Sequence, residues 1–465
     1  MADKDPLILD FTSGKVFDAD EYLDEYYASG FDDDESAYWD DIDLEDMFDL
    51  PPVLPPVRLP EEAELAVQAR RSALLADLRA LADEVRSTTV PADPVNPVLL
   101  RLAEEVEVVE RDGEDLAPGE DAGWLDDLAD DSDALDAWES TFAEVLDTTL
   151  EAADDSDPIV APDLELDGHG PALVTRLFLS WRDGVRITEL ADALKEDVTA
   201  GLEAEEADKQ WQEWVDAHGD PLRLLLGQLD RLGALSVTDD TARLEPLGIQ
   251  AVRSKLERDG LLVPVLPAPN EMTADDVVLV FMHGSDGDLE AELASWTDSR
   301  GEEQAARELL AFAAHGNAAT RTAAVTIVSR LGRPAEPAWR EALDRAELRC
   351  YAKPQLAKLA GLDPEGLPAE LQPERADVAW LITDTFGPFS HFDLGKGKFP
   401  FDFAELRRIS GLEKPEEVFE IISRLDHPDA EAVLAMIGKH ASDKTTAKAA
   451  RRAAYKASTR RAARR

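Results

Sequence analysis

A short glycine-rich stretch comes nearest in this sequence to a phosphate-binding site. In residues 394–399, LGKGKF, two glycines would let backbone amides approach a phosphate, and Lys396 and Lys398 would neutralise its charge. A P-loop, however, requires GxxxxGK followed by Ser or Thr at the start of a helix. Because Phe399 and Pro400 follow here, we expect an ordered surface loop rather than a phosphate site.

Other signatures of enzymes and metal sites are missing from the sequence. It contains no HExxH and no GxSxG, and its 7 histidines are scattered singly. Cys350, the sole cysteine, lies in a helical pattern, where a buried core residue is a simpler interpretation than an activated thiol. With 100 Asp and Glu, paired acids arise by chance at any spacing. We therefore predict no catalytic residue, no metal and no cofactor, and we favour a non-enzymatic protein while leaving enzymatic activity open.

Positive charge gathers at the C-terminal end of this acidic chain. Residues 439–465 contain 10 Lys or Arg and one acidic residue, Asp443. With Asp443 as a cap, the alanine-rich run after it is predicted to be a helix with one face of small residues. Its cations could bind nucleic acid phosphates or an acidic protein, and the candidate residues are Lys444, Lys448, Arg451, Arg452, Lys456, Arg460, Arg461, Arg464 and Arg465. An alternative of equal weight is that this segment is the last helix of the HEAT-like stack, followed by a solvated tail.

The N-terminal segment has the opposite charge and many aromatic rings. Residues 1–50 contain 18 acidic and 2 basic residues together with nine aromatics. Because this net charge opposes compaction, we predict that the tail is disordered in the free protein and offers its rings to a partner. The candidate partner-binding residues are Tyr22, Tyr26, Tyr27, Phe31, Tyr38, Trp39 and Phe48. The alternative, with equal weight, is that these rings dock on the protein's own body.

Composition bounds the class of protein and its compartment. The 465 residues are enough for about three domains, and a hydrophobic fraction of 44% allows ordinary cores. The net charge of −53 favours solubility and repels nucleic acid and anionic lipid. A single cysteine suits a reducing compartment, and the sequence has neither a basic, apolar leader nor an apolar run of about 18 residues. We therefore expect a cytoplasmic protein that does not bind membranes.

The chain before residue 171 is predicted to contain a tail, a linker and a small helical domain. Five prolines between residues 50 and 60 indicate an extended, stiff linker over 51–60. Apolar periodicity then predicts helices over 61–86, 98–109 and 134–150. We expect these helices to form a small domain, 61–160, with an acidic loop over 112–133.

Residues 171–260 follow the order of a winged helix. Two apolar helical faces precede a third helix, 222–232, for which Asp220 is the predicted cap and Pro221 the first-turn proline. Two short strands around a turn at residues 239–240 and a closing helix, 247–256, complete the pattern.

The charge of this segment bears on whether it reads DNA. A winged helix that binds DNA normally carries basic residues on its third helix, whereas this one carries only Arg223 and Arg231 there. Residues 171–260 contain 11 Lys or Arg against 18 Asp or Glu. We therefore favour a protein-binding or structural module over a DNA reader.

Helical patterns continue from residue 271 to residue 440. Paired helices separated by breaks at residues 316–317 and 333–334 are typical of HEAT-like repeats, in which each repeat buries its apolar face on its neighbour. The first of them is predicted over 277–282, after a capping box formed by Thr273 and Asp276, although the run of valines there would also suit a strand. A further helix is predicted over 403–409.

Residues 241–256, TARLEPLGIQAVRSKL, and residues 427–457, HPDAEAVLAMIGKHASDKTTAKAARRAAYKA, resemble two parts of one protein family. The stretch 241–256 is similar to the strand-then-helix end of winged modules in large, alanine-rich bacterial proteins of uncharacterised function. The stretch 427–457 resembles the basic hairpin of helices that closes the same proteins. The resemblance covers residues 171–465 and implies a winged-helix-like segment, HEAT-like helices and a basic C-terminal hairpin, but no activity.

These features predict a mostly α, multi-domain protein with a winged-helix-like module and a HEAT-like α-helical repeat region over 271–440. The function that fits them best is a non-enzymatic protein–protein interaction adaptor or scaffold, whose protein partner the sequence does not identify. The alternative is a nucleic-acid-associated regulator, linked to transcription or the ribosome, that uses the basic C-terminal residues 441–465.

Overall fold

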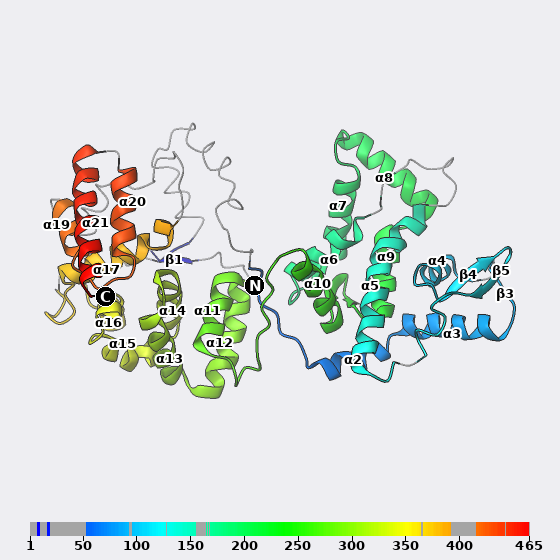
Figure 1. Cartoon of the computed structure of the whole chain (residues 1–465), viewed down its shortest axis with the longest axis horizontal. Helices are drawn as coiled ribbons and strands as arrows, with labels where there is room; N and C mark the ends of the chain where they lie inside the picture. Colours follow the sequence, from blue (N-terminus) through cyan, green and yellow to red (C-terminus); the bar gives the residue numbers. More distant parts are fainter. Residues whose placement is uncertain are drawn as a thin grey trace. The chain divides into compact units, whose positions relative to one another are not determined.

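The computed structural model describes most of the chain from residue 53 onward. The described residues are 53–92, 95–126, 128–154, 164, 166, 168–363, 366–391, 415–441 and 443–464, with the backbone of 7–9 and 16–18. Contacts divide the chain into an N-terminal unit, Val53–Leu266, and a C-terminal unit, Pro267–Arg465 together with Met1–Pro52. Both units are mostly helical, as the sequence predicts (Figure 1). Within the described residues, no helix has both the length and the apolar character that a membrane span requires.

Three sequence predictions fall outside the described residues. They concern the glycine-rich loop at 394–399, the helix predicted over 403–409, and the aromatic residues of the N-terminal tail between Tyr22 and Phe48. In the N-terminal segment, the backbone of two short strands, β1 (Leu7–Leu9) and β2 (Val16–Asp18), pairs in antiparallel fashion.

The first half of the N-terminal unit contains four helices and a small sheet. The helices are α2 (Glu62–Arg70), α3 (Ala73–Ser87), α4 (Pro97–Glu105) and α5 (Asp131–Asp154). The prediction of one helix over 61–86 is wrong, because Ser72 starts a new helix: its side chain accepts a hydrogen bond from the backbone N–H of Leu75 at 3.2 Å. The helix predicted over 98–109 is too long, since α4 ends at Glu105 and a strand begins at Val109.

A small sheet, not predicted from the sequence, extends into the segment 112–133 predicted as an acidic loop. It consists of β3 (Val90–Pro91), β4 (Val109–Asp112) and β5 (Asp115–Pro118), in the antiparallel order β3-β5-β4. Gly113 has a φ of +70° in the turn between β4 and β5, a conformation that favours glycine. The turn therefore reverses the chain within an otherwise acidic stretch.

The predicted proline-rich linker pairs with the end of the same unit. The backbone N–H of Val57 donates to the carbonyl oxygen of Pro264 at 2.9 Å, and the Val57 side chain is fully buried. Leu54 likewise donates to Leu262 at 2.9 Å. The extended conformation expected from the prolines is thus used for pairing inside the unit.

The second half of the N-terminal unit contains five helices and a second antiparallel sheet. They are α6 (Gly170–Leu179), β6 (Val185–Arg186), α7 (Ile187–Val198), α8 (Ala204–His218), α9 (Pro221–Leu232), β7 (Leu235–Thr238), β8 (Thr241–Leu244) and α10 (Pro246–Arg258). The sheet order is β6-β8-β7, and a turn at Asp239 and Asp240, both with positive φ, joins β7 to β8. The two predicted strands and the closing helix are confirmed, whereas β6 and α8 were not predicted.

The predicted ends of α9 are confirmed. The Asp220 side chain accepts a hydrogen bond from the backbone N–H of Arg223 at 3.2 Å, and Pro221 occupies the first turn. Gly233 ends the helix in a left-handed conformation with a φ of +80°. These local signals fix both ends of a helix whose apolar face is buried.

Helix α5 is the central element of the N-terminal unit (Figure 1). It packs against α2, α4, α6 and α9. The indole N–H of Trp138 on α5 donates to the carbonyl oxygen of Leu232 on α9 at 2.8 Å, inside the core. One cluster of buried hydrophobic residues extends from Val57 to Val263 and includes side chains from the segments predicted as helical domain and winged helix.

The C-terminal unit is a succession of helices. They are α11 (Ala274–His283), α12 (Asp286–Arg300), α13 (Glu302–His315), α14 (Ala318–Arg330), α15 (Glu336–Ala342), α16 (Ala346–Leu359), α17 (Arg375–Phe386), α19 (Pro415–Ile422), α20 (Ala430–His440) and α21 (Lys444–Arg464), with short 3-10 turns at Arg333–Ala335 and Pro388–His391. The predicted capping box of Thr273 and Asp276 is present at the start of α11. Several helices that follow each other pack together, as α11 does with α12 and α13 with α14.

Helices α20 and α21 form a closely packed hairpin. The predicted cap is confirmed, since the Asp443 carboxylate accepts a hydrogen bond from the backbone N–H of Thr446 at 2.7 Å. The small-residue face of α21 is buried through Ala447, Ala450, Ala453 and Ala457. A Cβ at Gly438 on α20 would lie 2.6 Å from Cγ of Arg451, so the hairpin requires a glycine there.

Candidate functional site

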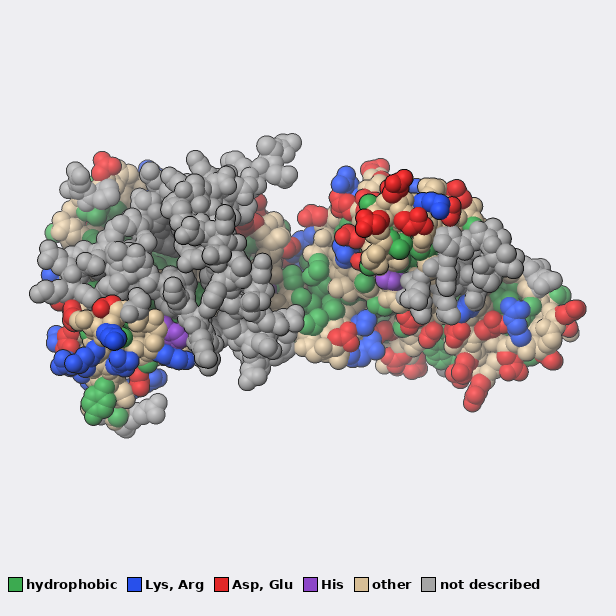
Figure 2. Space-filling model, turned by 90° about the horizontal axis from the view of Figure 1, so that it is seen from above, with side chains coloured by type: hydrophobic (Ala, Val, Ile, Leu, Met, Phe, Trp, Pro, Cys, Tyr) green, Lys and Arg blue, Asp and Glu red, His purple; other side chains and the backbone are tan. Residues whose placement is uncertain are grey.

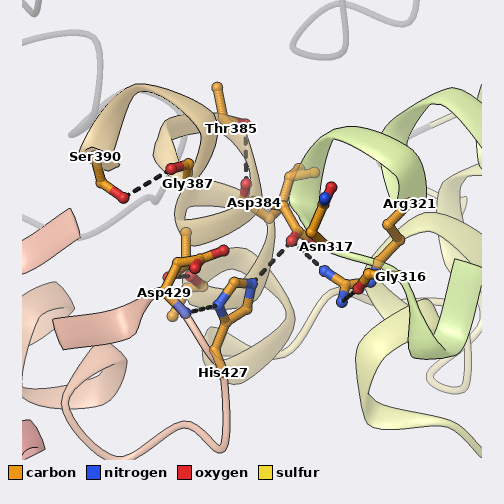
Figure 3. A network of polar contacts seen from close by, with 12 residues as sticks. Gly316, Asn317, Arg321, Asp384, Thr385, Gly387, Ser390, His427 and Asp429 are labelled. Atoms are coloured by element: carbon orange, nitrogen blue, oxygen red, sulfur yellow. Dashed lines mark hydrogen bonds and ion pairs between the residues drawn. The ribbon is translucent and has the colours of Figure 1, made fainter. Parts of the chain in front are cut away.

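Asp384 is the centre of a buried polar network in the C-terminal unit. Figure 3 shows Arg321 of α14, Asp384 of α17 and His427, which precedes α20, with their polar groups pointing toward one another. The Asp384 carboxylate forms an ion pair with Arg321 and a hydrogen bond of 2.8 Å with Nε2 of His427. It also accepts a hydrogen bond from the hydroxyl of Tyr351 on α16 at 2.9 Å. One carboxylate therefore joins three helices and a turn.

Hydrogen bonds fix the proton on the His427 ring. The backbone N–H of Asp429 donates to Nδ1 of His427 at 3.0 Å, so this nitrogen is an acceptor. Nε2 must then carry the proton, and it donates a hydrogen bond to the Asp384 carboxylate. Hydrogen bonds also fix the Arg321 guanidinium, because its remaining N–H groups donate to backbone carbonyl oxygens, among them that of Gly316 at 2.8 Å.

A second buried carboxylate lies on the same helix, at Asp377. It accepts hydrogen bonds from Nζ of Lys353 at 2.7 Å and from Nε of Arg349 at 2.8 Å. Burial raises the pKa of Asp377, but the hydrogen bonds from Lys353 and Arg349 outweigh that effect, so its pKa lies below the usual value. The paired charges fasten α16 to α17.

These buried groups are arranged for structure rather than for catalysis. Arg321, Asp384 and His427 have side chains that are at most 3% exposed, so a substrate in solvent cannot reach them. Cys350 is buried, as predicted, and burial raises the pKa of its thiol well above the usual value, which disfavours the reactive thiolate. Among the described residues, no group of His, Cys, Asp and Glu side chains could hold a metal ion.

Helix α9 does not offer a basic face to solvent. Its buried side chains include Leu222, Leu225 and Leu229, and the helix packs against α3, α5 and α7. Arg223 pairs with Asp220 at 3.1 Å, and Arg231 pairs with Asp77 of α3. The cations on which DNA binding by this helix would depend are thus engaged with carboxylates.

The basic residues of α21 lie on its solvent side. Lys444, Lys448 and Arg452 are exposed, and they follow one another at intervals of four residues, so they lie on one stripe of the helix. The ring of Tyr455 continues this stripe and is 76% exposed. Figure 2 shows Lys and Arg side chains gathered on the C-terminal unit, at the left of the view. We call Lys444, Lys448, Arg451, Arg452, Tyr455 and Lys456 the basic face of α21.

The structure brings together some of the predicted cations and separates others. Lys448, Arg451, Arg452 and Lys456 line a shallow depression with Tyr455. Arg460 and Arg461 instead point back to the unit, where they donate to the carbonyl oxygens of Ser423 at 3.0 Å and Pro428 at 3.5 Å. The side chains of Arg464 and Arg465 lie outside the described residues.

Two members of the basic face also have partners within the unit. Lys456 forms an ion pair of 2.5 Å with Glu420 of α19, and Arg451 donates to the carbonyl oxygen of Gly438 at 3.1 Å. Hydrogen bonds from Lys456 and from Arg424 lower the pKa of Glu420. For Lys444, Lys448 and Arg452 no ion pair is formed within the described part of the chain. These three cations are therefore the most available to an external anion.

Tyr455 is the member of the site that sequence reasoning missed. Aromatic rings are usually buried, so periodicity alone does not distinguish an exposed ring from a core ring. The sequence feature that could have identified Tyr455 is its position. It is the one aromatic residue in 444–465, and it lies three residues after Arg452 and four after Arg451.

Comparison with known proteins found no match to this chain among family models, curated proteins or solved structures.

Proposed function

We propose that this chain is a non-enzymatic adaptor or scaffold, acting in the cytoplasm, which docks a macromolecule of clustered negative charge on the basic face of α21. The observation that carries the proposal is the contrast between this face and the rest of the unit. The charged groups with the most elaborate hydrogen bonding, at Asp384 and Asp377, are sealed in the core. Lys444, Lys448 and Arg452 are exposed and have an exposed ring beside them.

The chemistry of the face supports binding rather than turnover. The side chains that line the depression include lysines and arginines, and its lining within the described part of the chain contains no carboxylate, histidine or thiol that could act as a base or a nucleophile. An acidic partner would be attracted over a Debye length and held by several contacts at once.

We further propose that residues 171–260 are a winged-helix-like module with a structural or protein-binding role, and that residues 271–440 are a HEAT-like helical region. The sheet order β6-β8-β7 and the tight turn between β7 and β8 support the first part. The side-by-side packing of successive helices supports the second. The burial of α9 against α3, α5 and α7 favours a module that does not read DNA.

Affinity capture with the full chain tests the proposal. The variant K448A/R452A, which loses two positive charges, is compared with R186A/K209A, a control that also loses one lysine and one arginine, each from an exposed ion pair in the other unit. Alanine favours the helix at both sites of α21, so the variant should fold. We expect wild type and control to retain a partner that K448A/R452A loses, and equal recovery from all three chains would contradict the proposal.

A further inference from the structure

We infer that the macromolecule bound by the basic face is an unpaired nucleic acid strand, with a base stacked on Tyr455 and phosphates held by the surrounding cations. The inference rests on the proposed function, because it names the partner of the same face. It adds a role for the ring, which attraction between charges alone does not require.

Tyr455 is the most exposed large hydrophobic side chain among the described residues. It is 76% exposed, whereas the next, Leu179, is 53% exposed. Alanines occupy the buried face of the same helix, so Tyr455 is not needed for the packing of α21 on α20. A ring left in water in this way has a face free to stack with another planar group.

Cations surround Tyr455 along the helix. Lys448, Arg451 and Arg452 precede Tyr455 by seven, four and three residues, and Lys456 follows it directly. Residues three and four apart on a helix are neighbours, so Arg451 and Arg452 lie beside the ring, and Lys456 lines the same depression as Tyr455. A single strand presents phosphates on either side of each base, which such a set can contact while the base lies on the ring.

The ring also discriminates between the possible polyanions. In a duplex the base faces are stacked on one another, and a side chain can reach them only if base pairs are separated at a cost of a few kcal/mol. An acidic protein would use the cations but has no general need for the ring. Stacking is sequence-tolerant because every base has a planar face, so the expected ligand is a single strand without a required sequence.

The ion pair between Lys456 and Glu420 makes Lys456 less available to a phosphate than Lys448 and Arg452 are. Glu420 also pairs with Arg424 at 2.7 Å, so a phosphate at Lys456 must compete with a carboxylate that is already held in place. Lys448 and Arg452 meet no such competition among the described residues. They should therefore make the stronger phosphate contacts.

Fluorescence anisotropy of the full chain with labelled single-stranded RNA and DNA of mixed sequence tests the inference. We expect Tyr455→Ala to weaken binding of both strands roughly tenfold, within the range that loss of one stacked base produces. Tyr455→Phe, which keeps the ring, should bind like wild type, and a duplex of the same length should bind more weakly. Because the ring is exposed, the thermal unfolding of all three chains should coincide.

The remaining outcomes separate this inference from the proposed function. If Tyr455→Ala binds the strands as tightly as Tyr455→Phe, or if the duplex binds as well as the strands, stacking is refuted. If polyglutamate binds and neither strand does, the nucleic acid inference is refuted while docking on the basic face stands. If K448A/R452A binds every one of these polyanions like wild type, both fail.

Discussion

Asp384 is the shared acceptor for three buried polar groups, those of Arg321, Tyr351 and His427. Arg321 and His427 both depend on its carboxylate, and each is buried. Removal of one partner from a buried ion pair leaves an uncompensated charge, which costs far more than the pair itself contributes. The network therefore selects one arrangement of α14, α16 and α17.

We predict that Asp384→Ala lowers the free energy of unfolding of the C-terminal unit by about 3–5 kcal/mol, because it leaves Arg321 buried without its ion pair. Asp286→Ala is the matched control, since it also removes an aspartate paired with an arginine, but at a site where the Asp286 side chain is 59% exposed. That control should lose at most about 1 kcal/mol. Urea denaturation measures both, and similar losses in the two variants would show that the buried pair has no special role.

Asp377 makes the folding stability of the C-terminal unit depend on pH in the acid range. Its pKa is lowered in the folded state, so it stabilises the fold above its unfolded pKa, and that contribution disappears as pH falls through the folded value. We predict that, below about pH 4, the melting temperature of wild type falls more steeply than that of Asp377→Asn. Thermal unfolding across this pH range is the measurement, and parallel curves would mean that Asp377 titrates equally in both states.

At the scale of elements, the sequence predicts those helix ends that are set by hydrogen bonds and backbone angles within a few residues. Asp220, Pro221 and Gly233 set the ends of α9 through hydrogen bonds and φ angles within a few residues, and so they could be predicted. The break at Ser72 was missed because the apolar stripe continues through it, and a serine in a helical pattern can equally well face solvent.

Other elements depend on contacts that a linear pattern does not contain. Helix α8 buries little more than Ala207 and Trp214 among many charged residues, so its apolar periodicity is weak. At the site, charge and helix could be predicted for α21, but whether a cation faces outward could not. Arg460 donates to a carbonyl oxygen just after α19, and Arg461 donates to one in the loop before α20. Only the tertiary structure determines these two orientations.

The close contact of α20 with α21 provides a test at the same scale. We predict that Gly438→Ala destabilises the C-terminal unit by about 1–3 kcal/mol, because its Cβ would lie 2.6 Å from Cγ of Arg451 and 3.2 Å from the Arg451 backbone nitrogen. Gly227→Ala is the control, since that glycine lies within α9 and a Cβ added to it would meet no atom within 4 Å. There alanine should stabilise the helix by about 0.5–1 kcal/mol, as seen by calorimetry. Equal shifts of the same sign would refute the close-packing argument.

At the scale of the whole molecule, the basic face is an exception on a chain with a net charge of −53. The remaining acidity repels polyanions, so we expect binding to depend on α21 and to weaken with salt. Deletion of α21 would be a poor test, because Ala450 and Ala453 belong to a shared core with α19 and α20. Surface substitutions leave that core intact and isolate the charges.

The salt dependence of binding to single-stranded RNA tests the central claim most directly. If Lys448 and Arg452 each neutralise a phosphate, K448A/R452A should lower the steepness of the plot of log affinity against log salt by about 1.4, at roughly 0.7 for each phosphate of a single strand. The control R186A/K209A should keep the slope of wild type, since its charges lie in the other unit. A slope for K448A/R452A that equals that of wild type would contradict docking of the RNA strand on the basic face of α21.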